Sequence, residues 1–561
     1  GAEVLFSVDC AKLEEYFLPG KRQFDCIYFN FPHCGRKAGV VKNRELLAGF
    51  FRSCAAVLAE EGEVHVALCN GQGGTPADRP RREWHNSWQI VALAAAAGFI
   101  LSSVHPFKAE TIPGYKCTGY RSQDKSFRVE GALNHVFTRS TPPLCFTPVS
   151  CQMQLGNQKV SFQVPQVLVD KINRGFLDPD SNHPVRTIRE KLSAGLSQAF
   201  PLQNISSCLP LLHQGHPPGV GHSSVFWVTL SPEEAPGAEE ASQGVADAVL
   251  FSRGGFWQHT DENVHKGCPI PEQFYLRPSL LPPALAIIHE GAFPPGTLHV
   301  LSGPVFRKCR ITPRSIPVFH EMLLVLAVSR GTESSCIQVL VENIKTTVNS
   351  LHQAVSGIKP SMNLREAASL ETELSDFAAF ECQLGEIQHF LCLGTGTDPS
   401  GCCVGVIRTA PHGLDSTELV LVSASLNLDL LAMLLCGISD WRMLWTSDRR
   451  FLRQFPEGEL RLFESFSLYP PSYVHDVSFW VPDGEEFDEV AFHTLAREVS
   501  GEMVVSIQLR DSFQQPGTGR RSLCYRVTFQ SCDRALGCGE AAEMQLRLRE
   551  EIRQHLGVTL R

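Results

Sequence analysis

The feature that most constrains the fold is the pattern of apolar residues within 464–561. Its segments follow one another as strand, helix, strand, strand, helix and strand. The strand predicted over 521–530 is apolar at alternate positions, which a strand turns to one face. The helix predicted over 540–556 is apolar at every fourth position and therefore has one buried side. Elements with one apolar face pack in layers, so we expect a ferredoxin-like βαββαβ domain.

Several short motifs in this region carry a family resemblance. They read Tyr-Pro-Pro-Ser-Tyr at 469–473, Asp-Val-Ser-Phe-Trp at 476–480, Asp-Ser-Phe at 511–513 and Cys-Tyr-Arg-Val at 524–527. Together they resemble the ferredoxin-fold anticodon-binding (FDX-ACB) domain, which closes phenylalanyl-tRNA synthetases. The resemblance implies that residues 464–561 bind structured RNA, either rRNA or tRNA.

Arginines and aromatic residues are the groups available there for RNA contact. Residues 464–561 contain ten arginines, no lysine and fifteen acidic residues, a net charge of −5. Arginine pairs with phosphate and stacks on bases, and aromatic rings stack on unpaired bases. The predicted RNA-binding residues are Trp480, Arg520, Arg521, Tyr525 and Arg526. The alternative is that both aromatic rings belong to the core and the arginines form a solvated surface.

Residues 181–460 form a larger mixed region with a net charge of −8. Its blocks at 183–192, 305–307, 318–320, 431–442 and 447–455 resemble the catalytic domain of phenylalanyl-tRNA synthetases. The resemblance implies a class II synthetase-like domain with a mixed antiparallel sheet.

The positions that carry synthetase chemistry have changed. A class II synthetase holds the adenylate phosphate with an arginine in a glycine-rich final motif. In this chain the motif reads Ser-Leu-Asn-Leu-Asp-Leu at 425–430, so Leu430 stands at the arginine position. Cys309 stands at the acidic partner position of the second motif. We therefore expect an inactive, degenerate domain, a structural salt bridge for Arg307, and phenylalanine–tRNA ligation as the least favoured function.

Residues 1–140 alternate between strand and helix patterns. Strands are predicted over 3–8, 24–29, 64–68 and 99–104, and helices over 88–97 and from Asn43 to a stop at Gly62. Strands separated by helices indicate a parallel sheet with helices on its faces. The run Phe-Asn-Phe-Pro-His at 29–33 resembles the active-site loop of the Rossmann-like domain in rRNA uridine-N3 methyltransferases.

This resemblance implies a site on the loop. Asn30 and His33 are the predicted catalytic residues, since an amide can accept a base N–H and an imidazole can remove the uridine N3 proton. Asp9, Phe31 and Pro32 are predicted to border S-adenosylmethionine, the methyl donor of such enzymes. The target base must be unpaired or flipped to reach that donor. For His33 the alternative is a loop hydrogen bond, and for Asp9 it is a helix N-cap.

The glycine-rich cofactor loop of such enzymes, Gly-x-Gly-x-Phe-Ser, does not precede Asp9 in this chain. We expect upstream residues of the full-length protein to supply it, together with the first strands of a truncated Rossmann-like sheet. S-adenosylmethionine is therefore predicted for the full-length protein alone. Two functions stay open: an S-adenosylmethionine-dependent rRNA methyltransferase with synthetase-derived RNA-binding modules, and a non-catalytic RNA-binding scaffold.

The remaining sequence features predict the cellular compartment and the segments that link the domains. Twenty cysteines occur without a Cys-x-x-Cys pair, which favours free thiols in a reducing compartment and predicts no metal site. No apolar run approaches the ~20 residues that span a bilayer. We expect no membrane association and a cytoplasmic location, with the nucleus or nucleolus as the alternative. Residues 141–180 are predicted to be a linker, and the acidic segment 231–248 a solvated insertion.

Overall fold

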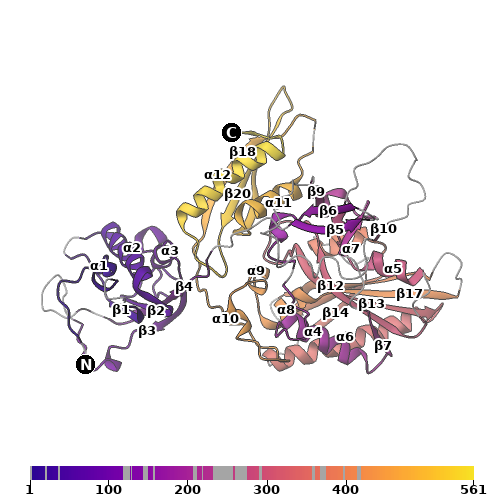
Figure 1. Ribbon diagram of the computed structural model, residues 1–561, viewed down its shortest axis with the longest axis horizontal. Helices are drawn as coiled ribbons and strands as arrows, with labels where there is room; N and C mark the ends of the chain where they lie inside the picture. The colour runs from indigo at the N-terminus through magenta and orange to yellow at the C-terminus, as the bar shows by residue number, and fades with distance from the viewer. Residues whose placement is uncertain are drawn as a thin grey trace. The chain divides into compact units, whose positions relative to one another are not determined.

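The computed structural model describes residues 3–18, 22–35, 38–117, 127, 129–142, 150–155, 158–172, 174–205, 211–215, 217, 219–231, 257–258, 274–289, 294–356, 361–366, 374–395, 398–412, 418–484 and 486–561 (Figure 1). The chain divides into two compact units. The first holds residues 1–144, 464–487 and 499–561, and the second holds 145–463 and 488–498. No helix in the described part of the chain is both long and apolar enough to cross a membrane.

The N-terminal sheet of the first unit has the strand order β1-β2-β4-β3. Its elements are α1 (Leu13–Phe17), β1 (Phe24–Asn30), α2 (Val40–Val57), β2 (Leu58–Leu68), α3 (Ile90–Ala95), β3 (Phe99–Pro106) and β4 (Leu133–Arg139). β1 and β2 run parallel, whereas β4 is antiparallel to both of its neighbours. A wholly parallel sheet was therefore the wrong expectation, because β4 returns between β2 and β3. Residues 3–8 form no strand, and most of their side chains are exposed.

Helices α2 and α3 pack against one face of this sheet. One buried cluster joins Leu47 and Phe51 of α2, Ile90 of α3, Val64 of β2 and Phe137 of β4. Alternation along β2 turns Glu63 and His65 to the opposite face, which carries polar side chains.

The C-terminal sheet of the first unit has the order β19-β20-β18-β21, and every neighbouring pair is antiparallel. Its strands are β18 (Tyr473–Trp480), β19 (Val504–Gln514), β20 (Arg521–Phe529) and β21 (Thr559–Leu560), and α12 (Cys538–His555) follows β20. Helix α11 (Glu489–Ser500) lies between β18 and β19 in the chain, and most of its residues belong to the second unit. This sequence of elements confirms the predicted ferredoxin-like βαββαβ order. The alternating residues Leu523, Val527 and Phe529 are buried, as are Leu548 and Ile552 of α12.

Hydrogen bonds connect the segments next to these two sheets within the first unit. The Leu468 N–H donates to the Leu101 carbonyl oxygen at 2.7 Å, and the Ala535 N–H donates to Ser140 Oγ at 2.8 Å. The first contact lies before the start of β18 and the second lies after the end of β20. Because Tyr473 pairs with Phe529, both contacts lie at the same end of the C-terminal sheet.

The second unit contains a seven-stranded sheet with the order β14-β15-β16-β17-β13-β12-β7. Its strands are β7 (Leu202–Asn204), β12 (Leu298–Phe306), β13 (Val318–Ser329), β14 (Ser361–Glu366), β15 (His389–Thr395), β16 (Asp398–Pro411) and β17 (Leu419–Asn427). All pairs are antiparallel except β7 with β12, so the sheet is mixed. Strand β13 is buried along nearly its whole length, as a strand covered on both faces is.

The helices of the second unit pack on this sheet and on one another. They are α4 (Pro184–Leu196), α5 (Leu281–His289), α6 (Glu333–Ser356), α7 (Asp376–Gln383), α8 (Leu428–Cys436), α9 (Trp441–Leu444) and α10 (Arg449–Leu452). Helices α4, α6 and α8 contact each other, and α6 and α8 contact β13.

A second sheet in this unit has the order β10-β8-β11-β9-β6-β5. Its strands are β5 (Ser150–Leu155), β6 (Gln158–Gln163), β8 (Leu212–Gln214), β9 (Trp227–Ser231), β10 (Trp257–Gln258) and β11 (Phe274–Leu276). Because β6 pairs with both β5 and β9, the linker prediction for 141–180 is wrong over these strands. In the predicted insertion at 231–248, residue 231 ends β9, and residues 232–248 lie outside the described residues.

Candidate nucleic-acid interface

The ferredoxin-like sheet has two different faces. Directly paired residues of antiparallel strands share a face, and Val477 pairs with Tyr525 among the buried residues. Alternation then turns Asp476 and its partner Arg526 to the other side, together with Trp480. Phe513 pairs with the same β20 residue as Trp480 does and so shares that side. We call the side that carries Trp480, Phe513, Asp476 and Arg526 the open face.

Trp480 lies among cationic and aromatic side chains on the open face. The Cζ atoms of Arg520 and Arg561 lie 5.1 and 5.3 Å from the centroid of its ring. The Phe513 ring lies 6.2 Å away, close to perpendicular, and Phe513 is 43% exposed. Cation–π attraction favours guanidinium groups near the face of an indole. This arrangement combines a ring that can stack on a base with charges that can pair with its phosphates.

The predicted arginines differ in their partners. Arg526 forms a bidentate ion pair with Asp476, with Nε–Oδ1 at 2.8 Å and Nη2–Oδ2 at 2.9 Å. The guanidinium holds the pKa of Asp476 below its usual value. Arg520 lies 3.6 Å from Asp483, and Arg521 is exposed. Phosphate would therefore compete with carboxylates for two of these three arginines.

Tyr525 does not belong to this interface. It is 3% exposed, and its ring stacks parallel to that of Phe479 at 6.0 Å. A ring buried on the covered face cannot stack on a base, so the core alternative holds for Tyr525. Its position in the strand contained this information, because Tyr525 shares a face with Leu523 and Val527.

The second predicted site lies at the carboxyl end of β1, where open α/β sheets bind ligands. Asn30 is the last residue of the strand. Phe31 follows with a φ of 52°, a left-handed conformation that is costly for a residue with a side chain. Pro32 is buried and His33 is exposed. The backbone therefore makes a strained turn that presents His33 to solvent.

A hydrogen bond at His33 indicates which ring nitrogen carries the proton in the neutral imidazole. The Gly35 N–H can only donate, so His33 Nδ1 accepts it, at 2.9 Å. A neutral imidazole has one acceptor nitrogen, so Nε2 carries the proton. His33 in this state donates from Nε2 and cannot take up a proton there. This contact is the loop hydrogen bond that the alternative interpretation expects, and the catalytic role of His33 stays a prediction.

Asn43 holds this loop in place, a role that the sequence analysis missed. Helix α2 starts at Val40 with Gly39 as its N-cap, so Asn43 lies inside the helix and does not cap it. Its side chain accepts the Cys34 N–H and donates to the Gly39 carbonyl, both at 3.1 Å. The buried amide therefore ties the loop after Pro32 to the first turn of α2.

The residues predicted to border S-adenosylmethionine, Asp9, Phe31 and Pro32, each have contacts within the chain. The Phe31 ring packs edge-on against Phe107 and Phe127, at 4.9 and 5.0 Å between centroids. Pro32 is buried, and Asp9 uses Oδ1 to accept the Ala11 N–H at 2.9 Å, just before α1. That turn resembles the helix-capping alternative for Asp9. Among these three residues Asp9 alone carries a charged group, an exposed carboxylate, and we derive no step through the cofactor.

The synthetase-like region keeps Arg307, but its charge is already paired. Arg307 Nη2 lies 2.5 Å from Glu381 Oε1, and Arg408 Nη2 lies 2.7 Å from the other carboxylate oxygen. Glu381, on α7, has no exposed surface. Arg307 also lies 4.1 Å from the ring centroid of Phe380. The predicted structural salt bridge of Arg307 is confirmed.

A cavity of about 630 Å³ opens beside this salt bridge. Its lining includes Arg307, Lys308, Arg310, Arg314 and Leu430. Leu430 lies in the first turn of α8, capped by the Asn427 side chain, and is 3% exposed. Burial lowers the pKa of Lys308. The lining is cationic, yet the position expected for a phosphate-binding arginine presents a hydrocarbon side chain.

Comparison with known proteins identifies two of these regions. Residues 1–119 match the family described as rRNA (uridine-N3-)-methyltransferase BTM5-like. Residues 467–561 match the ferredoxin-fold anticodon binding domain. The chain thus joins a methyltransferase-like domain to an anticodon-binding-type domain, as the sequence motifs had indicated.

Curated relatives cover the chain from end to end. Human ferredoxin-fold anticodon-binding domain-containing protein 1 is 47% identical over 577 residues, which span 100% of this chain and 90% of the relative. Its mouse homologue is 46% identical and spans 100% of this chain and 91% of the relative. The chain belongs to the family of ferredoxin-fold anticodon-binding domain-containing protein 1. The chloroplastic/mitochondrial phenylalanine–tRNA ligase of Arabidopsis thaliana is 31% identical over 47% of this chain and 59% of that protein.

Proposed function

We propose that the chain binds structured RNA through the open face of its ferredoxin-like sheet. The observation that carries the proposal is the cluster of Trp480, Arg520, Arg561 and exposed Phe513 on that face. Four-stranded sheets with aromatic residues on an open face bind RNA by stacking unpaired bases. The anticodon-binding-type match over residues 467–561 supports the same role.

The acidic net charge of this domain does not oppose the proposal. Net charge says nothing about where charges lie, and a local positive surface is enough to attract phosphate. All ten basic side chains of residues 464–561, histidine aside, are arginines. Arginine combines bidentate phosphate pairing with base stacking, which lysine does not.

Substituting Trp480 tests this function. We expect Trp480→Ala to weaken binding of a hairpin RNA with a single-stranded loop, measured by fluorescence anisotropy on the full chain. Losing one stacked base costs about 1–3 kcal/mol, roughly a 5- to 150-fold weaker affinity. Arg547→Ala is the control, because Arg547 is exposed on α12, which packs on the sheet. Equal affinities for the two variants, or binding that does not respond to salt, would contradict the proposal.

A second function, methylation of an unpaired uridine at N3, is supported by the strained Phe31 at the carboxyl end of β1. In this proposal the Asn30 amide orients the base, His33 Nε2 donates to a base carbonyl, and the N3 proton leaves to solvent as the N3–methyl bond forms. A methyl donor would supply the transferred group when bound. Mass spectrometry of N3-methyluridine in rRNA from cells that lack the protein separates the candidates. If N3-methyluridine is lost in these cells and is restored by the natural full-length protein but not by its Asn30→Ala variant, the result supports methylation. If the level of the modification is unchanged in these cells, the result supports a non-catalytic scaffold.

Aminoacyl-adenylate formation in the synthetase-like region is the function we propose has been lost. Leu430 supplies no charge to a phosphate, and the Arg307 guanidinium is already neutralised by Glu381 at 2.5 Å. The region then serves as a further RNA-contacting module in either of the two functions above.

A further inference from the structure

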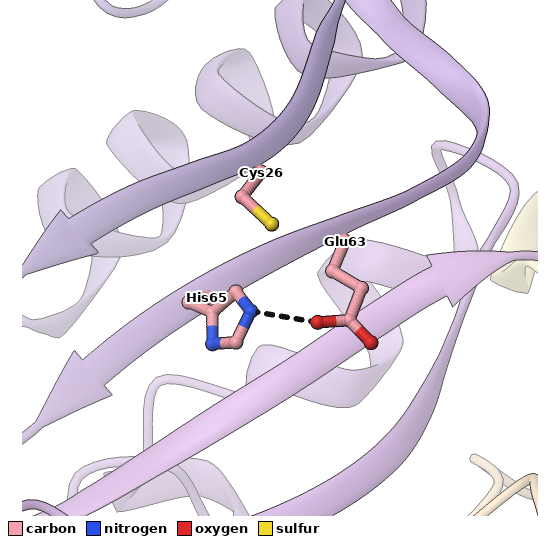
Figure 2. A group of neighbouring side chains, drawn as sticks. All are labelled: Cys26, Glu63 and His65. Carbon is pink, nitrogen blue, oxygen red and sulfur yellow. Dashed lines mark hydrogen bonds and ion pairs between the residues drawn. The ribbon is translucent and has the colours of Figure 1, made fainter.

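Parallel pairing of β1 and β2 brings together three side chains that are distant in sequence. Cys26 pairs with Glu63, and Tyr28 pairs with His65. The side chains of Cys26, Glu63 and His65 converge on the polar face of the N-terminal sheet, away from α2 and α3 (Figure 2). Their ligand atoms, one thiol sulfur, one carboxylate oxygen and one imidazole nitrogen, all lie within 4.8 Å of one another.

We propose that Cys26, Glu63 and His65 form a site for a zinc-class divalent metal ion. Zinc takes thiolate, imidazole and carboxylate ligands in tetrahedral sites. Zn–S of about 2.3 Å and Zn–N of about 2.0–2.1 Å place such ligand atoms roughly 3.3–3.8 Å apart. Cys26 and Glu63 are exposed enough to close the remaining gap by side-chain rotation.

The ligand chemistry selects the kind of ion. Calcium and magnesium prefer sites made entirely of oxygen ligands, whereas a thiolate with an imidazole selects zinc and related transition metals. Three protein ligands leave one tetrahedral position for water, as in open zinc sites. The ion would replace the direct contact between His65 Nε2 and Glu63 Oε2, which are 3.0 Å apart.

Neighbouring side chains hold His65 in the orientation that a metal ligand needs. Its Nδ1 lies 3.1 Å from the side-chain amide of Asn134 on β4. The amide nitrogen Nδ2 faces the ring, so Asn134 donates to Nδ1 in the metal-free chain and Nε2–H faces Glu63. In the metal-bound state that we propose, the amide is flipped so that its oxygen accepts Nδ1–H, which leaves the Nε2 lone pair for the metal. The Tyr28 ring stacks on the imidazole at 4.3 Å, with 23° between the planes. Outer contacts of this kind fix the tautomer and the direction of a ligating histidine.

Cobalt binding tests the proposal, because Co²⁺ occupies zinc sites and its thiolate complexes absorb by charge transfer. The reduced, chelator-treated full chain is titrated with Co²⁺, and Zn²⁺ is then added to displace it. We expect the charge-transfer band to develop with one equivalent in the wild type. Cys538→Ser is the control, since Cys538 is an exposed thiol at the start of α12 in the same unit. It should behave as the wild type does.

Two site variants give the decisive comparison. Cys26→Ser should remove the band, and Glu63→Gln should keep the thiolate but weaken cobalt binding at least tenfold. Both positions are solvent-accessible, and circular dichroism checks that each variant is folded. Absence of the band in the wild type, or a band of equal intensity in Cys26→Ser, would overturn the proposal. Because binding displaces the thiol proton, affinity should also fall as the pH is lowered. RNA binding by the open face does not enter these readouts.

Discussion

At the scale of single residues, the buried charges around Glu381 show what has become of the synthetase-like region. Arg307 and Arg408 reach one carboxylate from opposite sides, and Glu381 is fully buried. Buried charges persist in proteins when they are paired and hydrogen-bonded. Arg307, which this chain retains at 305–307 in a block that resembles the synthetase catalytic domain, is thus part of the internal structure of the chain.

Glu381→Gln tests this pairing. The substitution leaves two buried guanidinium groups without their direct ion-pair partner, which typically costs about 3–5 kcal/mol. We expect a corresponding fall in the free energy of unfolding of the second unit, measured by urea denaturation of the full chain. Glu386→Gln, at an exposed position just beyond α7, is the matched control and should change stability by less than about 0.5 kcal/mol. Equal effects of the two substitutions would show that the ion pair contributes nothing.

His493 makes the stability of the second unit depend on pH. Burial and the nearby charges of Arg497 and Arg310 lower its pKa from 6.5 to about 3. Its Nδ1 accepts the Ile311 N–H at 2.8 Å. Below pH 6.5 the unfolded chain binds a proton that the folded chain does not bind until about pH 3. Stability from the neutral His493 is therefore complete above pH 6.5 and decreases as the pH falls.

The expected slope is at most about 1.4 kcal/mol per pH unit between pH 6.5 and 3. His493→Gln should flatten the pH dependence of the unfolding free energy in this window, because glutamine binds no proton. His85→Gln, at an exposed histidine, should leave the profile as it is in the wild type. A profile that is unchanged in His493→Gln would contradict the assignment.

At the scale of elements, the ion pair between β18 and β20 sets how strongly the open face attracts phosphate. Asp476 holds Arg526 on that face and adds a negative charge beside the proposed RNA path. Exposed ion pairs contribute little to stability, about 0–1 kcal/mol. The carboxylate therefore affects binding more than folding.

Asp476→Asn should tighten RNA binding, since Arg526 becomes available to a phosphate. With one more phosphate contact, the slope of log affinity against log salt should steepen by about 0.7. Glu550→Gln removes one negative charge on α12 and should leave the slope unchanged. Equal or weaker binding by Asp476→Asn at low salt would mean that RNA does not reach Arg526.

The same strands show how far the sequence could predict the structure. In the ferredoxin-like domain each element has one apolar side, so local periodicity was enough to find all six elements. In contrast, β5 and β6 are strands that pair with each other, and β6 also pairs with β9. A local sequence pattern does not contain information about such distant pairing. The direction of β4 is likewise set by its neighbours.

The site residues also divide into those whose environment a local pattern predicts and those whose environment depends on distant segments. The burial of Tyr525 was implicit in its alternation with Leu523 and Val527. The partner of Asn43 is a backbone N–H in another loop, and Cys26 meets Glu63 and His65 only through the parallel register of two strands. Sequence spacing does not contain such contacts, which is why neither was predicted.

At the scale of the whole molecule, the net charge of −9 coexists with several regions that resemble RNA-handling proteins. Two surfaces could then meet RNA: the open face, and the cavity of the second unit lined by Lys308, Arg310 and Arg314. We assign the principal contact to the open face, because an aromatic ring and arginines meet there without a buried counter-charge.

Ultraviolet cross-linking of bound RNA to the full chain, followed by mass spectrometry of the peptides, tests this assignment most directly. If RNA binds to the open face, we expect cross-linked nucleotides on peptides that contain Trp480 of β18 and Phe513 of β19. Cross-links confined to residues 181–460, or to α12 within the ferredoxin-like domain, would contradict it.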